Sequence, residues 1–334
     1  MSGEGILLVG CGKQAEKHIA GFQAAGLTDI VLNDIDPKLA ASLADRKGLR
    51  WVETIDEALS DPKIAAVDVC TPTPFHYPLL TAAFNAGKHA FCEKPLCETA
   101  EQGRELARLA EERNRKCALG FIYRFAPAFE RLKALLDDEE RAEHGVLGRT
   151  IHATLKVGGR GSHAEWKHRL ADGGGAINEM LVHMLDLAMF LFGTDGDAKL
   201  LHKALLQPVR TINGKQMIAD AEDYVVAQAR FGGVEILLEA DLVTPVFFQQ
   251  VIVQSENGTF TGSIQDRQPS SLYLMQPSGE YPAGTTEFAF GEMDLFIKQM
   301  TDFARVLRER DYMPRSSITN GVRLLELIEK IRQA

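Results

Sequence analysis

The chain has 334 residues, of which 45% are hydrophobic and 25% charged, and its formal net charge is -9. This length exceeds one ordinary core and predicts two domains, while the composition is that of a globular protein. The acidic balance gives no support to a nucleic-acid partner or to binding at an anionic membrane surface.

The N-terminal residues and the cysteines favour the cytoplasm. Met1-Ser-Gly-Glu-Gly lacks the basic and then apolar pattern of a signal peptide, and no stretch approaches the roughly 18 apolar residues of a membrane span. The five cysteines form no Cys-x-x-Cys pair, which disfavours a disulfide framework or a zinc site. We therefore expect a reduced, cytoplasmic protein without a membrane partner.

The first part of the chain alternates short apolar runs with helical patterns, as βαβ units on a parallel sheet do. Strands are predicted at 6–9, 29–32, 51–52, 65–70, 89–92 and 117–121, and helices at 13–25, 37–43, 55–60, 76–85 and 99–114. Thr99 is expected to cap the last of these helices.

After Tyr123 the pattern changes to neighbouring strands without helices between them. A helix is predicted at 127–137, strands at 150–157, 200–206, 224–231, 234–242, 249–255 and 258–263, and terminal helices at 292–309 and 317–332. The Phe231-Gly-Gly-Val234 turn indicates a hairpin. We predict an α/β protein with a parallel-sheet domain at 1–122 and an α+β domain with a large, mostly antiparallel sheet at 123–334.

Gly10-x-Gly12-x-x-Ala15 follows a predicted strand and opens a helix, which is the context of a dinucleotide-binding turn. Gly10 permits the tight turn, Gly12 lets the backbone approach a pyrophosphate, and Ala15 allows the helix to pack on the strand. The helix N-terminus then faces the phosphates. The first domain is therefore predicted to be a Rossmann domain, with a plain tight turn as the alternative.

Asp34 ends the second predicted strand, 19 residues after Ala15. A carboxylate at this place can accept hydrogen bonds from both ribose hydroxyls of the adenosine half and repels a 2′-phosphate. NAD is therefore favoured over NADP. The alternative is that Asp34 only starts the following turn or caps the next helix.

Glu93-Lys94-Pro95 follows a predicted strand, at the carboxyl edge where open α/β sheets place ligands. A lysine with a lowered pKa beside a nicotinamide can carry a proton, and Glu93 can orient it or a ribose. Taken without this context, the lysine would be read as a solvated surface residue.

Gly173-Gly-Gly175 precedes Glu179, His183 and Asp186, which would share one face of an α-helix. Histidine suits proton exchange at neutral pH, and Glu179 is expected to orient its ring or to hold a substrate hydroxyl. A core histidine beside a carboxylate is the alternative. We expect no metal, because no second histidine or cysteine stands at ligand spacing nearby.

Three further features are candidates for ligand contact. Thr71-Pro-Thr-Pro-Phe-His76 occupies the loop after the fourth strand, where a ribose or nicotinamide would pass. Arg124, at the expected domain junction, is expected to hold a substrate or an interdomain acid. Trp166 and Lys167 precede the glycine run, so they are expected to line a pocket, with packing as the alternative for Trp166.

Together these motifs resemble the glucose-fructose oxidoreductase / inositol dehydrogenase / MocA family. The resemblance rests on Gly-x-Gly-x-x-Ala at 10–15, Asp34 with Pro37, Thr-Pro-x-x-x-His at 71–76, Gly-Lys-His-Ala-Phe-Cys-Glu-Lys-Pro at 87–95, Tyr-Arg-Phe-x-Pro at 123–127, and Gly-Gly-Gly at 173–175 before His183-x-x-Asp186. It implies NAD(P)-dependent redox chemistry at a hydroxyl of a sugar or cyclitol, and a second domain whose open sheet forms homodimer or homotetramer contacts. The family commonly carries aspartate where this chain has Glu179, which leaves the role of Glu179 open.

The resemblance implies Lys94 and His183 as catalytic residues, and we add Glu179. The residues expected to contact the cofactor are Gly10, Cys11, Gly12, Lys13, Gln14, Asp34, Thr71, Pro72, Thr73, His76, Glu93 and Lys94. Those expected to contact a small polyhydroxylated substrate are Lys94, Arg124, Trp166, Lys167, Asn178, Glu179 and His183. The alternatives are an NAD-dependent glycosidase or epimerase that acts through a transient ketone, and a protein that only senses NAD or a sugar.

Overall fold

The computed structural model describes residues 4–137, 145–159, 164–265, 268–291 and 294–333. The chain divides into two compact units. The first unit comprises Met1–Ile122 and Asp294–Glu326, and the second comprises Tyr123–Met293 and Leu327–Ala334. The predicted second domain at 123–334 differs from this division at the C-terminus, because Met300 and Phe303 are part of the core of the first unit.

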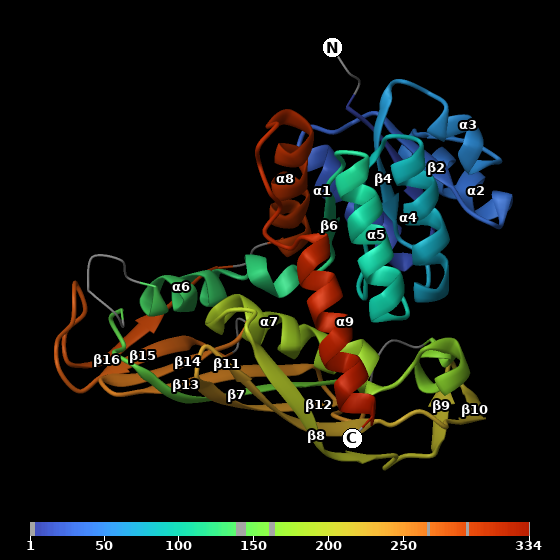
Figure 1. Cartoon of the computed structure of the whole chain (residues 1–334). Helices are drawn as coiled ribbons and strands as arrows, with labels where there is room; N and C mark the ends of the chain where they lie inside the picture. Colours follow the sequence, from blue (N-terminus) through green and yellow to red (C-terminus); the bar gives the residue numbers. More distant parts are fainter. Residues whose placement is uncertain (1–3, 138–144, 160–163, 266–267, 292–293, 334) are drawn as a thin grey trace. The chain divides into compact units, whose positions relative to one another are not determined.

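The sheet of the first unit has six parallel strands in the order β3-β2-β1-β4-β5-β6 (Figure 1). The strands are β1 (Gly5–Val9), β2 (Ile30–Asn33), β3 (Arg50–Trp51), β4 (Ile64–Val69), β5 (His89–Cys92) and β6 (Cys117–Leu119). The chain moves outward from β1 to β3 in one direction and from β4 to β6 in the other. The carboxyl ends of β1 and β4 therefore flank the switch point at which doubly wound sheets bind ligands.

Helices connect these strands and cover the sheet. They are α1 (Lys13–Ala24), α2 (Pro37–Lys47), α3 (Ile55–Leu59), the 3-10 turn η1 (Thr73–Phe75), α4 (His76–Asn85), α5 (Ala100–Glu112) and α8 (Leu295–Arg308), with α9 (Ile318–Gln333) divided between the units. Thr99 caps α5 as predicted, since its side chain accepts a hydrogen bond from the N–H of Gln102. Helix α8 approaches α1 so closely that a Cβ at Gly21 would lie 2.8 Å from Cγ of Met300.

The second unit is built on an eight-stranded sheet in the order β16-β15-β14-β13-β7-β12-β11-β8. The strands are β7 (Thr150–Gly158), β8 (Gly196–Ala204), β11 (Tyr224–Phe231), β12 (Val234–Asp241), β13 (Phe248–Ser255), β14 (Gly258–Gly262), β15 (Ser270–Leu274) and β16 (Gly284–Phe288). Only the β7–β12 pair is parallel among these neighbours, so the predicted mostly antiparallel sheet is confirmed. The predicted hairpin is present as well, with φ of 53° at Gly232 and 81° at Gly233.

One face of this sheet is covered by helices (Figure 1). The helical segments of the unit are η2 (Ile122–Phe125), α6 (Pro127–Leu136), η3 (Glu165–His168), η4 (Leu170–Asp172), η5 (Ile177–Leu181) and α7 (Val182–Phe192). Side chains alternate along the strands: Ile236, Leu238 and Ala240 of β12 are buried, whereas Glu235 and Leu237 between them are exposed. In the part of the chain that the structure describes, no helix covers the face that carries Leu237.

The second unit also contains features that were not predicted. The strands β9 (Val209–Ile212) and β10 (Lys215–Ile218) form a separate two-stranded ribbon around Asn213-Gly214, whose positive φ angles of 50° and 78° suit a tight hairpin turn. Leu170–Phe192 is long and apolar enough to cross a membrane by length and composition, but 72% of its most apolar window is buried in the structure. That burial is typical of a core helix.

Candidate active site

The loops that follow β1, β4 and β5 meet at the carboxyl edge of the first unit's sheet. Gly10 has φ of 99°, and a Cβ at this position would lie 2.7 Å from the carbonyl oxygen of Cys70. Only glycine fits here, because the turn after β1 approaches the backbone after β4 and also needs a positive φ. The N–H of Glu93 donates to the carbonyl of Val69 at 2.9 Å, which brings the loop after β5 to the same edge.

The start of α1 fits a dinucleotide phosphate. Gly12 is the N-cap and offers no side-chain oxygen to the first N–H groups, and a Cβ built on it would meet no atom within 4 Å. Lys13 and Gln14, in the first turn, are exposed. Helix N-termini without a capping side chain, and with open space in front of them, attract anions. Nearby in the fold, Oγ1 of Thr71 after β4 is buried and has no hydrogen-bond partner among the described residues.

Asp34 lies beside this turn and is held by backbone N–H groups. Its Oδ2 accepts from the N–H of Cys11 at 2.7 Å, and its Oδ1 accepts from the N–H of Asp36 at 2.9 Å. Asp36, rather than Asp34, caps α2 by accepting from the N–H of Lys38 at 3.0 Å. The carboxylate of Asp34 therefore starts the turn after β2 and at the same time fixes the nucleotide-binding turn.

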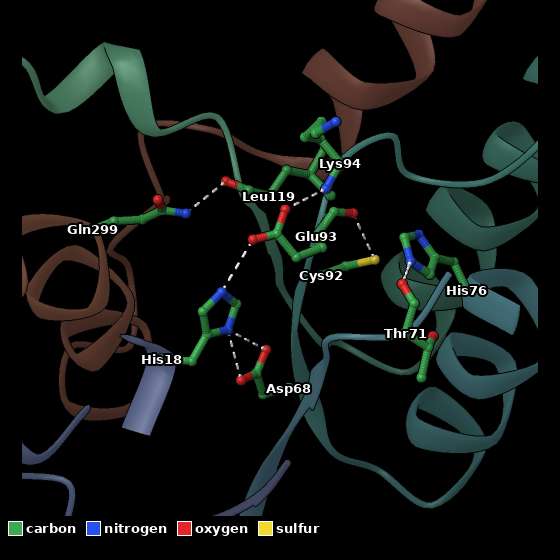
Figure 2. A network of polar contacts seen from close by, with 9 residues as sticks. All are labelled: His18, Asp68, Thr71, His76, Cys92, Glu93, Lys94, Leu119 and Gln299. Atoms are coloured by element: carbon green, nitrogen blue, oxygen red, sulfur yellow. Dashed lines mark hydrogen bonds and ion pairs between the residues drawn. The ribbon is translucent and has the colours of Figure 1, made fainter. Parts of the chain in front are cut away.

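Glu93 belongs to a buried network with His18 and Asp68 (Figure 2). His18, on α1, and Asp68, in β4, are both 0% exposed. Nδ1 of His18 lies 2.9 Å from Oδ2 of Asp68, and Nε2 lies 3.0 Å from Oε1 of Glu93. The other oxygen of Glu93, Oε2, accepts from the backbone N–H of Lys94 at 3.2 Å.

The network is a protonated imidazole between two carboxylates. Burial lowers the pKa of His18, but Asp68 and Glu93 outweigh burial and raise it to about 10. Burial raises the pKa of Glu93, but the hydrogen bond and the charge of His18 lower it to about 2. Burial raises the pKa of Asp68, which its contact with His18 opposes. With both carboxyl groups ionised, each ring nitrogen of His18 carries a hydrogen and donates it.

The side chain of His76 connects two of the loops through their backbone carbonyl groups. Its Nδ1 lies 2.8 Å from the carbonyl oxygen of Pro95, and its Nε2 lies 2.8 Å from the carbonyl oxygen of Thr71. The ring is 1% exposed, and burial lowers its pKa. His76 thus links the carbonyl of Pro95, just after the cis Lys94–Pro95 bond, to the loop after β4. Its predicted contact with the cofactor stays a prediction.

In the second unit, the regular α-helix that was predicted to carry Glu179 together with His183 and Asp186 is wrong at Glu179. Ile177–Leu181 is a π-helix, in which the N–H of Val182 bonds to the carbonyl of Ile177 five residues earlier. Regular α-helix starts only at Val182, so the rotation of 100° per residue does not apply from Asn178 to Leu181.

The π-helical turn has a partner that we did not predict. Oε1 of Glu222 accepts from the N–H of Ile177 at 3.1 Å, and the Glu222 carbonyl accepts from the N–H of Ala176 at 2.8 Å. Gly175 makes room for this carboxylate, because a Cβ there would lie 2.4 Å from Oε1 of Glu222. The glycine run therefore leaves space for the side chain of Glu222 at the start of the helix.

Two of the predicted substrate contacts are brought together by an ion pair. Lys167 pairs with the carboxylate of Glu179, which is 7% exposed. The ammonium of Lys167 also lies 5.2 Å from the ring centroid of Trp166, so all three predicted residues are neighbours. The ring of His183 packs at 5.0 Å from the ring of Tyr123.

Asn178 and Arg124 have structural partners within the second unit. Nδ2 of Asn178 donates to the Gly173 carbonyl at 2.8 Å, and its Oδ1 accepts from Arg332 at 2.6 Å. Arg124 is 4% exposed, and its Nη2 lies 2.7 Å from Oδ1 of Asp186. Arg124 thus holds an acid of its own unit rather than the interdomain acid that was one of its two predicted partners.

No group of three or more histidine, cysteine, aspartate or glutamate side chains suited to a metal ion occurs in the described parts of the chain.

His18, Asp68 and Glu222 were not predicted from the sequence as parts of the site. The signal available for Asp68 was an aspartate in the otherwise apolar segment Ile64–Val69, and that for His18 was a histidine on the same helix face as Ala15, Ile19 and Phe22.

Comparison with known proteins identifies the family. Residues 5–121 match the NAD-binding Rossmann fold of the GFO/IDH/MocA oxidoreductase family, and residues 140–334 match the C-terminal alpha/beta domain of that family. The chain belongs to this family and is an NAD-binding oxidoreductase. The NAD cofactor, the Rossmann fold and the family predicted from the sequence are confirmed.

Several relatives are named dehydrogenases. Inositol 2-dehydrogenase of Rhizobium meliloti (strain 1021) is 28% identical over 80% of this chain and 76% of its own length. D-glucoside 3-dehydrogenase of Escherichia coli (strain K12) is 31% identical over 56% of this chain and 54% of its own length. Levoglucosan dehydrogenase in complex with NADH and levoglucosan has the same fold, with a TM-score of 0.85 and 21% identity over 98% of this chain and 96% of its own.

Proposed function

We propose that the protein transfers a hydride between NAD and a secondary hydroxyl or ketone of a sugar, sugar derivative or cyclitol. The observation that carries this proposal is the position of Lys94, one residue beyond the Glu93 network and at the sheet edge that also holds the Gly10 turn and Asp34. The named relatives act, by their names, on an inositol and a glucoside. NADP is the less favoured cofactor, because Asp34 would repel its 2′-phosphate.

When bound, NAD accepts or supplies the hydride. Lys94 and His183 hydrogen-bond the reacting oxygen, and one of them takes the hydroxyl proton during oxidation and returns it during reduction. The pairing of Lys167 with Glu179 supports a polar substrate wall in the second unit, with Trp166 beside it. In this scheme Lys167 and Glu179 hydrogen-bond substrate hydroxyls that do not react.

The test is the near-ultraviolet absorbance of NADH during incubation with inositol, a methyl glucoside or levoglucosan, with NAD and NADP compared. Lys94→Met should lower kcat by about 10²–10⁴-fold, the usual worth of general acid–base catalysis, and should change NAD affinity much less. Lys63→Met is the matched control, since Lys63 is exposed and lies before β4, at the opposite end of the strands.

The outcomes separate the alternatives. A net absorbance change that depends on Lys94 supports a dehydrogenase. Turnover of a substrate without net absorbance change would instead support a glycosidase or epimerase with a transient ketone. Binding of NAD without turnover of any substrate would support a sensor, and a fully active Lys94→Met variant would remove Lys94 from the mechanism.

We further propose that the protein is a homodimer or homotetramer that associates through the uncovered face of the second unit's sheet. Leu237 is 41% exposed in the middle of that face, where its register partners are Thr154 and Gln228. An exposed apolar residue at the centre of a broad sheet favours burial by a partner. Light scattering at micromolar concentration should show an oligomer that Leu237→Lys weakens and Leu39→Lys, on α2, leaves unchanged; a monomeric wild type contradicts the proposal.

We also propose that the protein is located in the cytoplasm. All five cysteines are free thiols, and Cys92, Cys97 and Cys117 are buried. Burial raises the pKa of the Cys92 and Cys117 thiols. Free thiols are typical of reducing compartments. Fractionation of the native host cells, followed by detection of the protein, would test the location directly.

A further inference from the structure

We propose that His18 is a positioning residue for Lys94. The imidazolium of His18 holds the carboxylate of Glu93 in the orientation that fixes the backbone of Lys94, and Asp68 fixes the ring of His18. This inference rests on the proposed role of Lys94 in proton transfer. Neither His18 nor Asp68 is expected to touch the reacting atoms.

The ring of His18 has one orientation available. Its Nδ1 lies 3.2 Å and 2.9 Å from the two oxygens of Asp68, and its Nε2 lies 3.0 Å from Oε1 of Glu93. The ring also packs edge-on against Phe91 at 5.5 Å and against Phe296 at 5.8 Å between centroids. A ring flip would aim carbon atoms at both carboxylates, so the contacts on the two sides hold one another in place.

The carboxylate of Glu93 connects the fixed ring of His18 to the backbone of Lys94. While Oε1 faces His18, Oε2 accepts from the backbone N–H of Lys94 at 3.2 Å. Gly120 leaves the space for this arrangement, since a Cβ there would lie 2.9 Å from Oε2 of Glu93. The side chain of Lys94 points away from the network in Figure 2, so the network acts on the backbone from which the ammonium extends.

The charge of His18 supports this role of Glu93 in addition to the hydrogen bond. Asp68 and Glu93 would otherwise be two neighbouring carboxylates with little access to water, and such a pair favours protonation of one member. A protonated Glu93 would present a hydroxyl group, and its hydrogen bond to the N–H of Lys94 would be weaker. His18 therefore keeps Glu93 ionised as well as oriented.

Two neutral substitutions separate positioning from packing. The amide nitrogen of glutamine stands at the same number of bonds from Cα as Nε2 of histidine, and that of asparagine stands at the place of Nδ1. His18→Gln therefore keeps a donor for Glu93, whereas His18→Asn keeps a donor for Asp68 only. A structural role alone would make the two variants alike in activity.

The experiment measures kcat, KM for NAD and melting temperature with NAD and the best of inositol, methyl glucoside and levoglucosan. We expect His18→Asn to lower kcat by about 10²-fold, the effect of misplacing a catalytic group by about 1 Å. His18→Gln should stay within about 10-fold of the wild type, and KM for NAD should change less than kcat in both variants. Equal losses of kcat in the two variants, or a His18→Asn variant with more than about a third of the wild-type kcat, would overturn the proposal.

If a His18 variant fails to fold, two other measurements test the positioning role of His18. Gly120→Ala leaves His18 intact but pushes the Glu93 carboxylate away, so it should lower kcat by about 10-fold or more; unchanged kcat would refute positioning through Glu93. In ¹⁵N-histidine NMR of the wild type, both ring nitrogens of His18 should carry a proton at neutral pH. A neutral ring would equally refute the proposal.

Lys94→Met distinguishes this inference from the proposed function. If Lys94→Met is inactive and His18→Asn is fully active, only the positioning role fails. If Lys94→Met is fully active, the proposed role of Lys94 in proton transfer fails whatever the His18 variants do. The NMR signal of the Lys94 amide gives a readout without turnover, because His18→Asn should shift it and His18→Gln should shift it less.

Discussion

Replacing Asp186 with leucine should lower the free energy of unfolding of the second unit by about 3–5 kcal/mol, the cost of leaving a buried charge without its partner. Asp186 is 1% exposed and Arg124 is 4% exposed, so water cannot take the place of the carboxylate. Nε of Arg124 lies 2.8 Å from Oδ2 of Asp186, and Nη2 lies 2.7 Å from Oδ1. Two hydrogen bonds to a charged group, at about 1.5–3 kcal/mol each, give about 3–6 kcal/mol, which overlaps that range.

Urea unfolding followed by circular dichroism measures this loss. The matched control is the double variant Arg124→Met with Asp186→Leu, which removes both charges and should unfold within about 2 kcal/mol of the wild type. A loss below about 1 kcal/mol for Asp186→Leu, or a double variant as unstable as the single one, would refute the reasoning. If the double variant is stable, its KM for substrate also tests the predicted contact between Arg124 and substrate.

Three further predictions concern single residues. Asp34→Ala should weaken NAD binding by about 10-fold and leave NADP binding equal or stronger, as fluorescence titration would show; a wild type that prefers NADP contradicts the assignment. Asn178→Ala should lower the free energy of unfolding by about 1–3 kcal/mol because it removes the bonds to Gly173 and Arg332, and unchanged urea unfolding would argue against this role. The pKa of His18 is raised from 6.5 to about 10, so its stabilising effect is complete below pH 6.5 and is lost as the pH rises through about 10. The wild type should therefore lose stability relative to His18→Asn over that range, in urea unfolding at several pH values.

The parts of the fold that depend on local sequence were predictable. Gly10 and the Gly232-Gly233 turn need positive φ angles, and Thr99 needs only its neighbour Gln102 to cap a helix. Strand β12 alternates in burial with a period of two and was predicted to within one residue. Strands β9, β15 and β16 were missed because they are short and contain polar or exposed residues that weaken the alternation.

The candidate site was predictable where a residue's function follows from its place at a strand end. Lys94 and Asp34 are of this kind, since a strand, its end and the following turn are visible in the sequence. His18 is not, because its partners Asp68 and Glu93 lie 50 and 75 residues away along the chain. The π-helical turn was missed for the same reason, since Glu222, which bonds to its start, is 45 residues from Ile177.

The packing of α8 on α1 has a consequence for the order in which the protein folds during synthesis. Phe303 lies 6.2 Å from Phe22 and 5.6 Å from Phe91 between ring centroids, so a residue made near the end of translation completes the core of the first unit. When residue 122 leaves the ribosome, all six strands of that sheet have been made, yet the side of α1 that packs on α8 is still uncovered. The N-terminal unit therefore finishes folding after the strands of the second unit have been synthesised, which reverses the usual order of domains. A chain that stops before α8 would expose these aromatic side chains and would aggregate rather than bind nucleotide.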